Sequence, residues 1–250
     1  MTRTKKTIWS LVFLAAFIFL FLPGDFPENS QFQTTIESFS DHDVLVIFNS
    51  GGWGNTPLEK ADDFEPIVKG IEETLDDLGY DSVIASYERT KNGFLGKVEG
   101  AREFVTFFPD QSKKLAQQIE YFLDNNPNSK IIMAGLSSGG VFVDRVMENL
   151  SSEKIEKVLA IEIGVPFWEE SLNHKNVLLV NNEGHDPLAE KELPVLLLSL
   201  IKAPFKWISS RFSGKTISFS RALHIPGHDY FWDSTPTKAK IISFLKSNIR

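Results

Sequence analysis

Short apolar runs alternate with longer amphipathic stretches along most of this chain. The short runs are typical of buried strands, and they occupy residues 44–48, 82–87, 130–134, 158–163, 177–180 and 216–223. Apolar residues at three- and four-residue spacing predict helices over residues 64–79, 115–123, 141–150 and 237–249. Strands that alternate with helices predict an α/β fold, in which helices flank both faces of a mostly parallel sheet.

A separate apolar run covers residues 8–22, and three basic residues precede it: Arg3, Lys5 and Lys6. The run is short for a spanning helix and long for the core of a cleaved signal, and no A-x-A-like cleavage site occurs before the polar stretch that follows it. Residues 1–25 are therefore predicted to form an uncleaved single-pass membrane anchor. The flanking charges place the N-terminus in the cytoplasm and the rest of the chain on the extracytoplasmic side. A cleaved signal, which would release a secreted protein, is the alternative.

The rest of the chain has the length and composition of one globular domain. Residues 26–42 are polar and are predicted to be a linker, which leaves residues 43–250 for the domain. A net charge of −7 makes nucleic acid an unexpected partner. The chain has no cysteine, so covalent catalysis would need a nucleophile other than a thiol. No metal-binding or cofactor-binding motif occurs, and no cofactor is implied.

One short motif joins a predicted strand to a predicted helix. Residues 135–139 read Gly-Leu-Ser-Ser-Gly and fit G-x-S-x-G, whose sharp strand-to-helix turn exposes the central serine. The turn needs residues without a Cβ on both sides, which accounts for Gly135 and Gly139. Ser137 is therefore the candidate nucleophile. Ser138 does not fit the central position, because Leu136 stands where that register needs glycine.

A serine nucleophile needs a base within reach, and histidine is the usual one. His228 lies in a Pro-Gly-His-Asp turn between the last predicted strand and the final helix, which makes it the candidate general base. His224 is the second choice, since its place at the end of an apolar strand favours a packing role. His42 and His174 precede strands, and solvated loop positions are expected for them.

The histidine in turn needs a carboxylate on its other ring nitrogen. Asp186 follows the predicted strand at residues 177–180 and is the candidate acid. Glu183 is close enough in sequence to compete with it. Asp229 is a poor candidate, because side chains of adjacent residues point apart on an extended or turn backbone.

These motifs together resemble the α/β-hydrolase family. The resemblance rests on the strand–G-x-S-x-G–helix unit, on Gly184-His185-Asp186-Pro187-Leu188 after a later strand, and on Gly227-His228 before the last helix. It extends over residues 44–249 and includes the order Ser, Asp, His, which that family uses. The resemblance implies a parallel α/β-hydrolase sheet and a catalytic triad of Ser137, Asp186 and His228.

The family also forms an oxyanion hole from the turn after an early strand and from the residue that follows the nucleophile. Residues 49–54 read Asn-Ser-Gly-Gly-Trp-Gly after the first predicted strand, which is similar to the family's H-G-G-G loops apart from the leading residues. The resemblance thus implies that backbone N–H groups of Gly52 or Trp53, together with that of Ser138, bind the developing oxyanion.

The expected activity is hydrolysis of a carboxylester or lipid-like acyl ester through an acyl-enzyme intermediate. Two segments rich in apolar and basic residues, 88–109 and a possible cap at 188–213, are candidates for shaping a substrate pocket. A buried core helix is the alternative for the cap. An acyltransferase with the same triad and a catalytically silent binding module remain alternatives for the whole protein. The sequence leaves the oligomeric state open.

Overall fold

The computed structural model describes most of the predicted domain. The described residues are 28–40, 42–91, 108–168, 172–182, 185–192 and 227–249, with single positions at 93, 96, 106, 202, 209, 210, 213 and 225. Several predicted features lie outside them: the anchor at residues 1–25, the strand at 216–223, His224, Glu183, and most of the segments 88–109 and 188–213. Within the described residues, no helix is long and apolar enough to cross a membrane.

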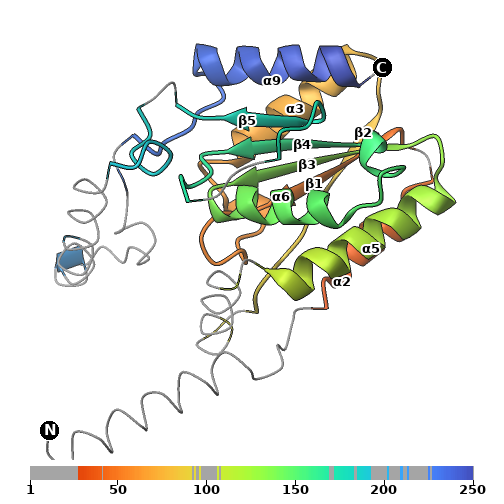
Figure 1. Cartoon of the computed structure of the whole chain (residues 1–250), viewed down its shortest axis with the longest axis horizontal. Coiled ribbons are helices and arrows are strands. Elements are labelled where there is room, and N and C mark those ends of the chain that lie inside the picture. The colour runs from red at the N-terminus through yellow and green to blue at the C-terminus, as the bar shows by residue number, and fades with distance from the viewer. Residues whose placement is uncertain are drawn as a thin grey trace, which may run out of the picture.

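The centre of the part of the chain that the structure describes is a five-stranded sheet in which every neighbouring pair is parallel. Its strands are β1 (Val44–Asn49), β2 (Ser82–Ser86), β3 (Lys130–Leu136), β4 (Val158–Ile163) and β5 (Val177–Val180). They lie in the order β2-β1-β3-β4-β5, and Figure 1 shows β1, β3, β4 and β5 side by side in this order. Strands β1 and β4 are buried along their whole length, as expected for a parallel sheet that is covered on both faces.

Two layers of helices provide that cover (Figure 1). The helices are α2 (Ser30–Glu37), α3 (Glu65–Asp77), α5 (Pro109–Asn125), α6 (Ser138–Asn149) and α9 (Thr235–Asn248), and short 3-10 helices span Leu58–Lys60 and Ile155–Lys157. Helices α2, α5 and α6 pack on one face, and α3 and α9 pack on the other. Successive residues of β1 alternate between the two cores, with Leu45 and Ile47 in one and Val46 and Phe48 in the other.

The five predicted strands within the described residues and all four predicted helices are confirmed. Helices α5 and α6 begin several residues earlier than their apolar periodicity indicates. Pro109 occupies the first helical position of α5, where the missing N–H costs nothing. Helix α6 begins with Ser138, Gly139 and Gly140, whose small side chains carry no apolar signal. Both helix starts are therefore determined by backbone requirements.

The prediction of a polar linker over residues 26–42 is wrong for its central part. Residues Ser30–Glu37 form helix α2, which contacts β2. Phe32 is fully buried in the core and makes an edge-to-face contact with Tyr87, with ring centroids 5.2 Å apart. Asn29 adds two hydrogen bonds to the backbone of Glu88, one from its amide N–H₂ and one to its amide oxygen. One buried aromatic residue in a polar stretch carries no periodicity, so the sequence pattern missed it.

The strand order brings two loops to the carboxyl end of the sheet at one place. The chain leaves β1 toward β2 on one side, and β3 lies on the other side of β1. In open α/β sheets, ligands bind outside the carboxyl ends of the strands where the strand order reverses. The loop after β1 and the turn after β3, which hold Gly52 and Ser137, meet at this point.

Replacing Phe32 with alanine tests whether α2 belongs to the folded domain. Removal of a fully buried phenylalanine side chain is expected to lower the free energy of unfolding by about 3–5 kcal/mol, measured by denaturant titration of the full chain. Gln33→Ala, at an exposed position of the same helix, should change it by less than about 0.5 kcal/mol. Equal effects of the two substitutions would show that α2 does not contribute to the core.

Candidate active site

Ser137 lies in the tight turn between β3 and α6 with a backbone conformation that is rare for a residue with a side chain. Its φ is 53° and its ψ is −117°. Such conformations cost about 1–3 kcal/mol and persist only where the surroundings hold them. The N–H of Ser137 donates to the carbonyl of Ile163 at 2.7 Å, and its carbonyl accepts from Gly140 and Val141 at 2.9 and 3.1 Å. The serine is thus fixed between the end of β4 and the first turn of α6.

The glycines on either side of Ser137 allow this turn to form. A Cβ at Gly135 would lie 2.3 Å from the carbonyl oxygen of Gly139. A Cβ at Gly139 would lie 2.3 Å from the carbonyl oxygen of Asn49 and 2.8 Å from that of Ser50. Because all of these contacts are with backbone atoms, a side chain at either position would require the turn or the end of β1 to move. The structure agrees with the sequence argument for Gly135 and Gly139.

The candidate base and acid form a hydrogen-bonded pair. His228 Nδ1 lies 2.8 Å from Oδ2 of Asp186, which follows β5 and is fully buried. The hydroxyl of Tyr230 donates to the same carboxylate oxygen at 2.5 Å, and the backbone N–H of Leu188 donates to Oδ1 at 2.9 Å. An ionised carboxylate only accepts hydrogen bonds. His228 therefore carries its proton on Nδ1 in this pair, which leaves Nε2 able to accept another.

The surroundings of Asp186 favour its charged form. Burial acts to raise the pKa of the carboxyl group, but the hydrogen bond and charge of His228, with the bonds from Tyr230 and Leu188, outweigh it, so the pKa lies below its ordinary value. The pKa of Tyr230 is raised, first because the phenol is buried and then because it donates to Asp186. Tyr230 therefore stays protonated and remains a donor to the acid.

His228 lies against the segment after β4 that hydrogen-bonds to the backbone of Ser137. Gly164 follows Ile163, whose carbonyl accepts from the Ser137 N–H, and Gly164 has a φ of 61°. A Cβ at Gly164 would lie 2.7 Å from His228 Cε1 and 2.7 Å from Tyr230 Cε2. Only glycine leaves room for the imidazole at this point. The turn at residues 163–164 thus contacts the backbone of Ser137 and the ring of His228.

The loop after β1 packs directly on the start of α6. Gly52 has a φ of 59°, in the left-handed region, and its carbonyl accepts from Ser138 Oγ at 2.8 Å. The carbonyl of Trp53 accepts from Thr90 Oγ1 at 2.6 Å, and the Trp53 side chain is partly exposed. The predicted oxyanion residues Gly52, Trp53 and Ser138 are therefore neighbours beside Ser137.

The other histidine and aspartate candidates in the described residues lie far from Ser137 or point away from His228. His42 bonds to Asp81 at 2.8 Å at the amino ends of β1 and β2, and His174 lies at the amino end of β5. Both are at the opposite edge of the sheet from Ser137, as their expected loop positions indicate. Asp229 is exposed while its neighbour His228 faces Asp186, in agreement with the expectation that adjacent side chains point apart.

Sequence reasoning missed Tyr230 and did not assign a role to Arg89. Tyr230 is two residues beyond His228, so on an extended backbone it shares the histidine's face, which is a signal that was available. Arg89 was only one of several basic residues in the candidate pocket segment at 88–109. Its contacts join positions 39 and 49 residues away in sequence, and no local pattern indicates such pairs.

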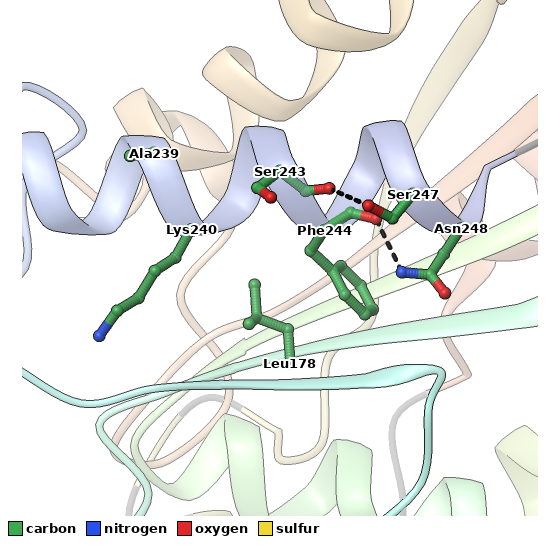
Figure 2. Close-up of a pocket in the computed structure, with 7 residues that line it drawn as sticks. All are labelled: Leu178, Ala239, Lys240, Ser243, Phe244, Ser247 and Asn248. Atoms are coloured by element: carbon green, nitrogen blue, oxygen red, sulfur yellow. Dashed lines mark hydrogen bonds between the residues drawn. The ribbon is translucent and has the colours of Figure 1, made fainter.

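A groove between α9 and the edge strand β5 is separate from this site. Figure 2 shows its lining: Leu178, Ala239, Lys240, Ser243, Phe244, Ser247 and Asn248. Ser247 Oγ and Asn248 Nδ2 donate to helix carbonyls one turn earlier, at 2.8 and 2.9 Å. The groove contains none of the residues around Ser137, and the side chains of Ser247 and Asn248 bond to the helix itself.

Comparison with solved structures supports the fold that the sequence suggested. An acetylxylan esterase structure aligns over 84% of this chain and 100% of its own, with 14% sequence identity and a TM-score of 0.50. A Trichoderma reesei cutinase aligns over 66% of this chain and 80% of its own, with 16% identity and a TM-score of 0.41. No protein-family model and no curated protein sequence matches the chain. The likeness to the first structure shows the fold alone, and the expected α/β-hydrolase fold is confirmed.

The pKa shift of Asp186 predicts an acid sensitivity of the fold. Because the pKa is lowered on folding, Asp186 contributes stability above its ordinary pKa of 3.8, and this stability is lost as the pH falls through the lower folded value. Asp186→Asn removes the titration. The difference in unfolding free energy between the wild type and this variant should therefore shrink as the pH falls below 3.8. A difference that stays constant down to pH 2 would contradict the shift.

Proposed function

We propose that this chain, which has the α/β-hydrolase fold, is a serine hydrolase that cleaves carboxylesters through an acyl-enzyme intermediate. Ser137 is the nucleophile, His228 is the general acid and base, and Asp186 orients the histidine. The observation that carries the proposal is the hydrogen-bonded pair of His228 and buried Asp186, in which the His228 ring packs on Gly164, next to the residue whose carbonyl holds strained Ser137. Strain of this kind at a serine between a strand and a helix is typical of catalytic nucleophiles.

In the first half of the reaction, Ser137 Oγ attacks the ester carbonyl carbon while its proton passes to Nε2 of His228. The bond between the carbonyl carbon and the alcohol oxygen then breaks, and the alcohol leaves with the proton from His228. A water molecule repeats the sequence on the acyl-enzyme: His228 takes its proton, the carboxylic acid forms, and Ser137 Oγ recovers the proton. Asp186 stays ionised throughout and stabilises the imidazolium that forms twice.

Backbone N–H groups beside Ser137 stabilise the oxyanion in this mechanism. The N–H of Ser138 begins helix α6, where amides have no partner within the helix. The loop that holds Gly52 and Trp53 supplies the second donor. One such donor contributes a factor of about 10²–10³ in rate. The left-handed conformation of Gly52 supports this role, because it allows the loop to turn its amides out of the line of β1.

An uncharged or lipid-like acyl ester is the proposed substrate class. Exposed aromatic side chains occur at Trp53 in the loop after β1, at Trp168 in the loop after β4 and at Phe231, three residues after His228. They favour apolar substrate groups over charged ones. The acetylxylan esterase that shares the fold is, by its name, also an esterase. An acyltransferase would differ by its products, since little acyl group would reach water when its acceptor is present.

Labelling with a fluorophosphonate probe tests the nucleophile directly. Ser137→Ala is expected to abolish labelling and esterase activity, measured with a p-nitrophenyl ester. Ser138→Ala is the matched control, and it should retain at least about a tenth of the activity because only its backbone N–H acts on the substrate. Equal loss in both variants would contradict the assignment. A wild-type protein that neither reacts with the probe nor cleaves esters would indicate the silent binding module instead.

The same assay tests the other two residues. His228→Ala and Asp186→Asn should each lower kcat by at least about 10³, and neither should add much to the effect of Ser137→Ala, because the three residues act as a unit. If Glu183→Gln lowers kcat while Asp186→Asn does not, Glu183 is the acid.

The run at residues 8–22 supports a further part of the proposal, a membrane anchor. As a helix it would reach about 22 Å at 1.5 Å per residue, so flanking residues or a thinner bilayer must complete the span. The full chain should sediment with membranes, resist extraction by carbonate and dissolve in detergent. A soluble product whose N-terminus begins after Leu22 would show that the segment is a cleaved signal and that the protein is secreted.

A further inference from the structure

Arg89 is the largest fully buried side chain among the described residues, with 1% of its surface exposed. It lies three residues after β2, at the carboxyl end of the sheet. Burying a guanidinium group is costly unless its N–H groups are satisfied by well-placed acceptors. The position of those acceptors therefore indicates what the residue does in the structure.

The guanidinium group of Arg89 joins the two backbone segments that flank Ser137. Its Nη2 donates to the carbonyl of Ser50 at 2.5 Å, in the loop after β1. The same nitrogen donates to Ser138 Oγ at 3.2 Å, and Nη1 donates to the carbonyl of Ser138 at 3.2 Å. Ser138 Oγ in turn donates to Gly52. One planar group thus holds the loop after β1 against the first residue of α6.

The surroundings of Arg89 leave this group little freedom. The guanidinium group packs on the aromatic rings of Phe108 and Phe142. The ring centroids lie 4.8 and 5.4 Å from the guanidinium carbon. Its backbone N–H donates to Gly54 at 2.7 Å, and its carbonyl accepts from Gln111 at 2.5 Å. A Cβ at Gly54 would lie 2.5 Å from Arg89 Nε, so glycine is needed where the loop passes the side chain. The arginine and the loop are fitted to each other.

We infer that Arg89 is the positioning residue of the oxyanion hole, because it fixes the loop at residues 50–54 relative to the N–H of Ser138. The inference rests on the proposed function. The two proposed donors come from different segments, the turn after β3 and the loop after β1, and their separation must match one oxygen atom. Donors act only when they lie about 2.7–3.1 Å from the oxyanion. A bidentate planar group sets that separation better than a single point charge does.

Replacement of Arg89 should therefore impair catalysis more than binding. Arg89→Met keeps the apolar stem between the two phenylalanine rings and removes all donors. It is expected to lower kcat by about 10²–10³, the value of one oxyanion donor, with little change in KM. Arg89→Lys offers one ammonium group and should recover only part of the loss. Arg145→Met is the matched control, since Arg145 lies within α6 and pairs with Glu148 on the surface of that helix. The kcat of this variant should match that of the wild type.

A thionoester substrate separates positioning from general damage. Oxyanion donors stabilise a developing oxygen anion better than a developing sulfur anion, so an intact hole prefers the oxygen ester. In Arg89→Met, the ratio of kcat/KM for the oxygen ester to that for the thionoester should fall at least about tenfold. Both substrates meet the same enzyme sample, so loss of folded protein cancels in the ratio. If Arg89→Met yields no folded protein, Arg89→Lys provides the measurement, and its ratio should lie between those of Arg89→Met and the wild type.

The outcomes distinguish this inference from the proposed function. Active wild-type enzyme and a lowered ratio in the Arg89 variants would support both. Active wild-type enzyme and an unchanged ratio in those variants, even with a lower kcat, would overturn the inference and leave the proposed function intact. Wild-type protein without esterase activity and without labelling at Ser137 would overturn both.

Discussion

The structure around Ser137 depends on one close approach between two backbone segments. The start of α6 lies so near the end of β1 that a Cβ at Gly139 would overlap the carbonyl oxygens of Asn49 and Ser50. This contact forces the sharp turn after β3 and puts Ser137 at a φ of 53°. The strain is offset by backbone hydrogen bonds from Ser137 to Ile163 and from Gly140 and Val141 to Ser137. Any side chain at Gly139 would separate the two segments and release the serine from its exposed position.

The parallel sheet then determines which residues can meet this serine. The carboxyl ends of all five parallel strands lie at one end of the sheet. The segments after β1, β3, β4 and β5 therefore converge there. The segment after β4 contributes Gly164, which leaves room for the ring of His228. The segment after β5 contributes Asp186, and the segment before α9 contributes His228 and Tyr230. Residues that precede strands, such as His42, lie at the amino ends of the strands and are not part of the candidate active site.

The sequence predicts the structural features that a local pattern of residues determines. It does not predict the features that depend on a single contact between residues far apart in the chain. Strand and helix positions followed from periodicity, and the pairing of His228 with Asp186 followed from a motif and its placement after strands. Two features had no such signal. Phe32 is a single apolar residue in a polar stretch, and Arg89 contacts residues 39 and 49 positions away. Tertiary contacts specify these two, and periodicity does not report them. The position of Tyr230 two residues beyond His228 is a local signal, but its hydrogen bond to Asp186, 44 positions away, has none.

Among the buried charged side chains of the described residues, Asp186 and Arg89 each constrain the geometry of a different part of the site. Asp186 and Arg89 have exposures of 0% and 1%, and a buried charged group is tolerated only when its hydrogen bonds are well placed. Any movement of His228 would weaken a bond that Asp186 needs. Any movement of the loop at residues 50–54 would weaken bonds that Arg89 needs. The cost of leaving either charge poorly bonded therefore opposes displacement of the imidazole and of the backbone amides. The free-energy cost of a buried charge without hydrogen-bond partners therefore holds the candidate site in one arrangement before a substrate binds.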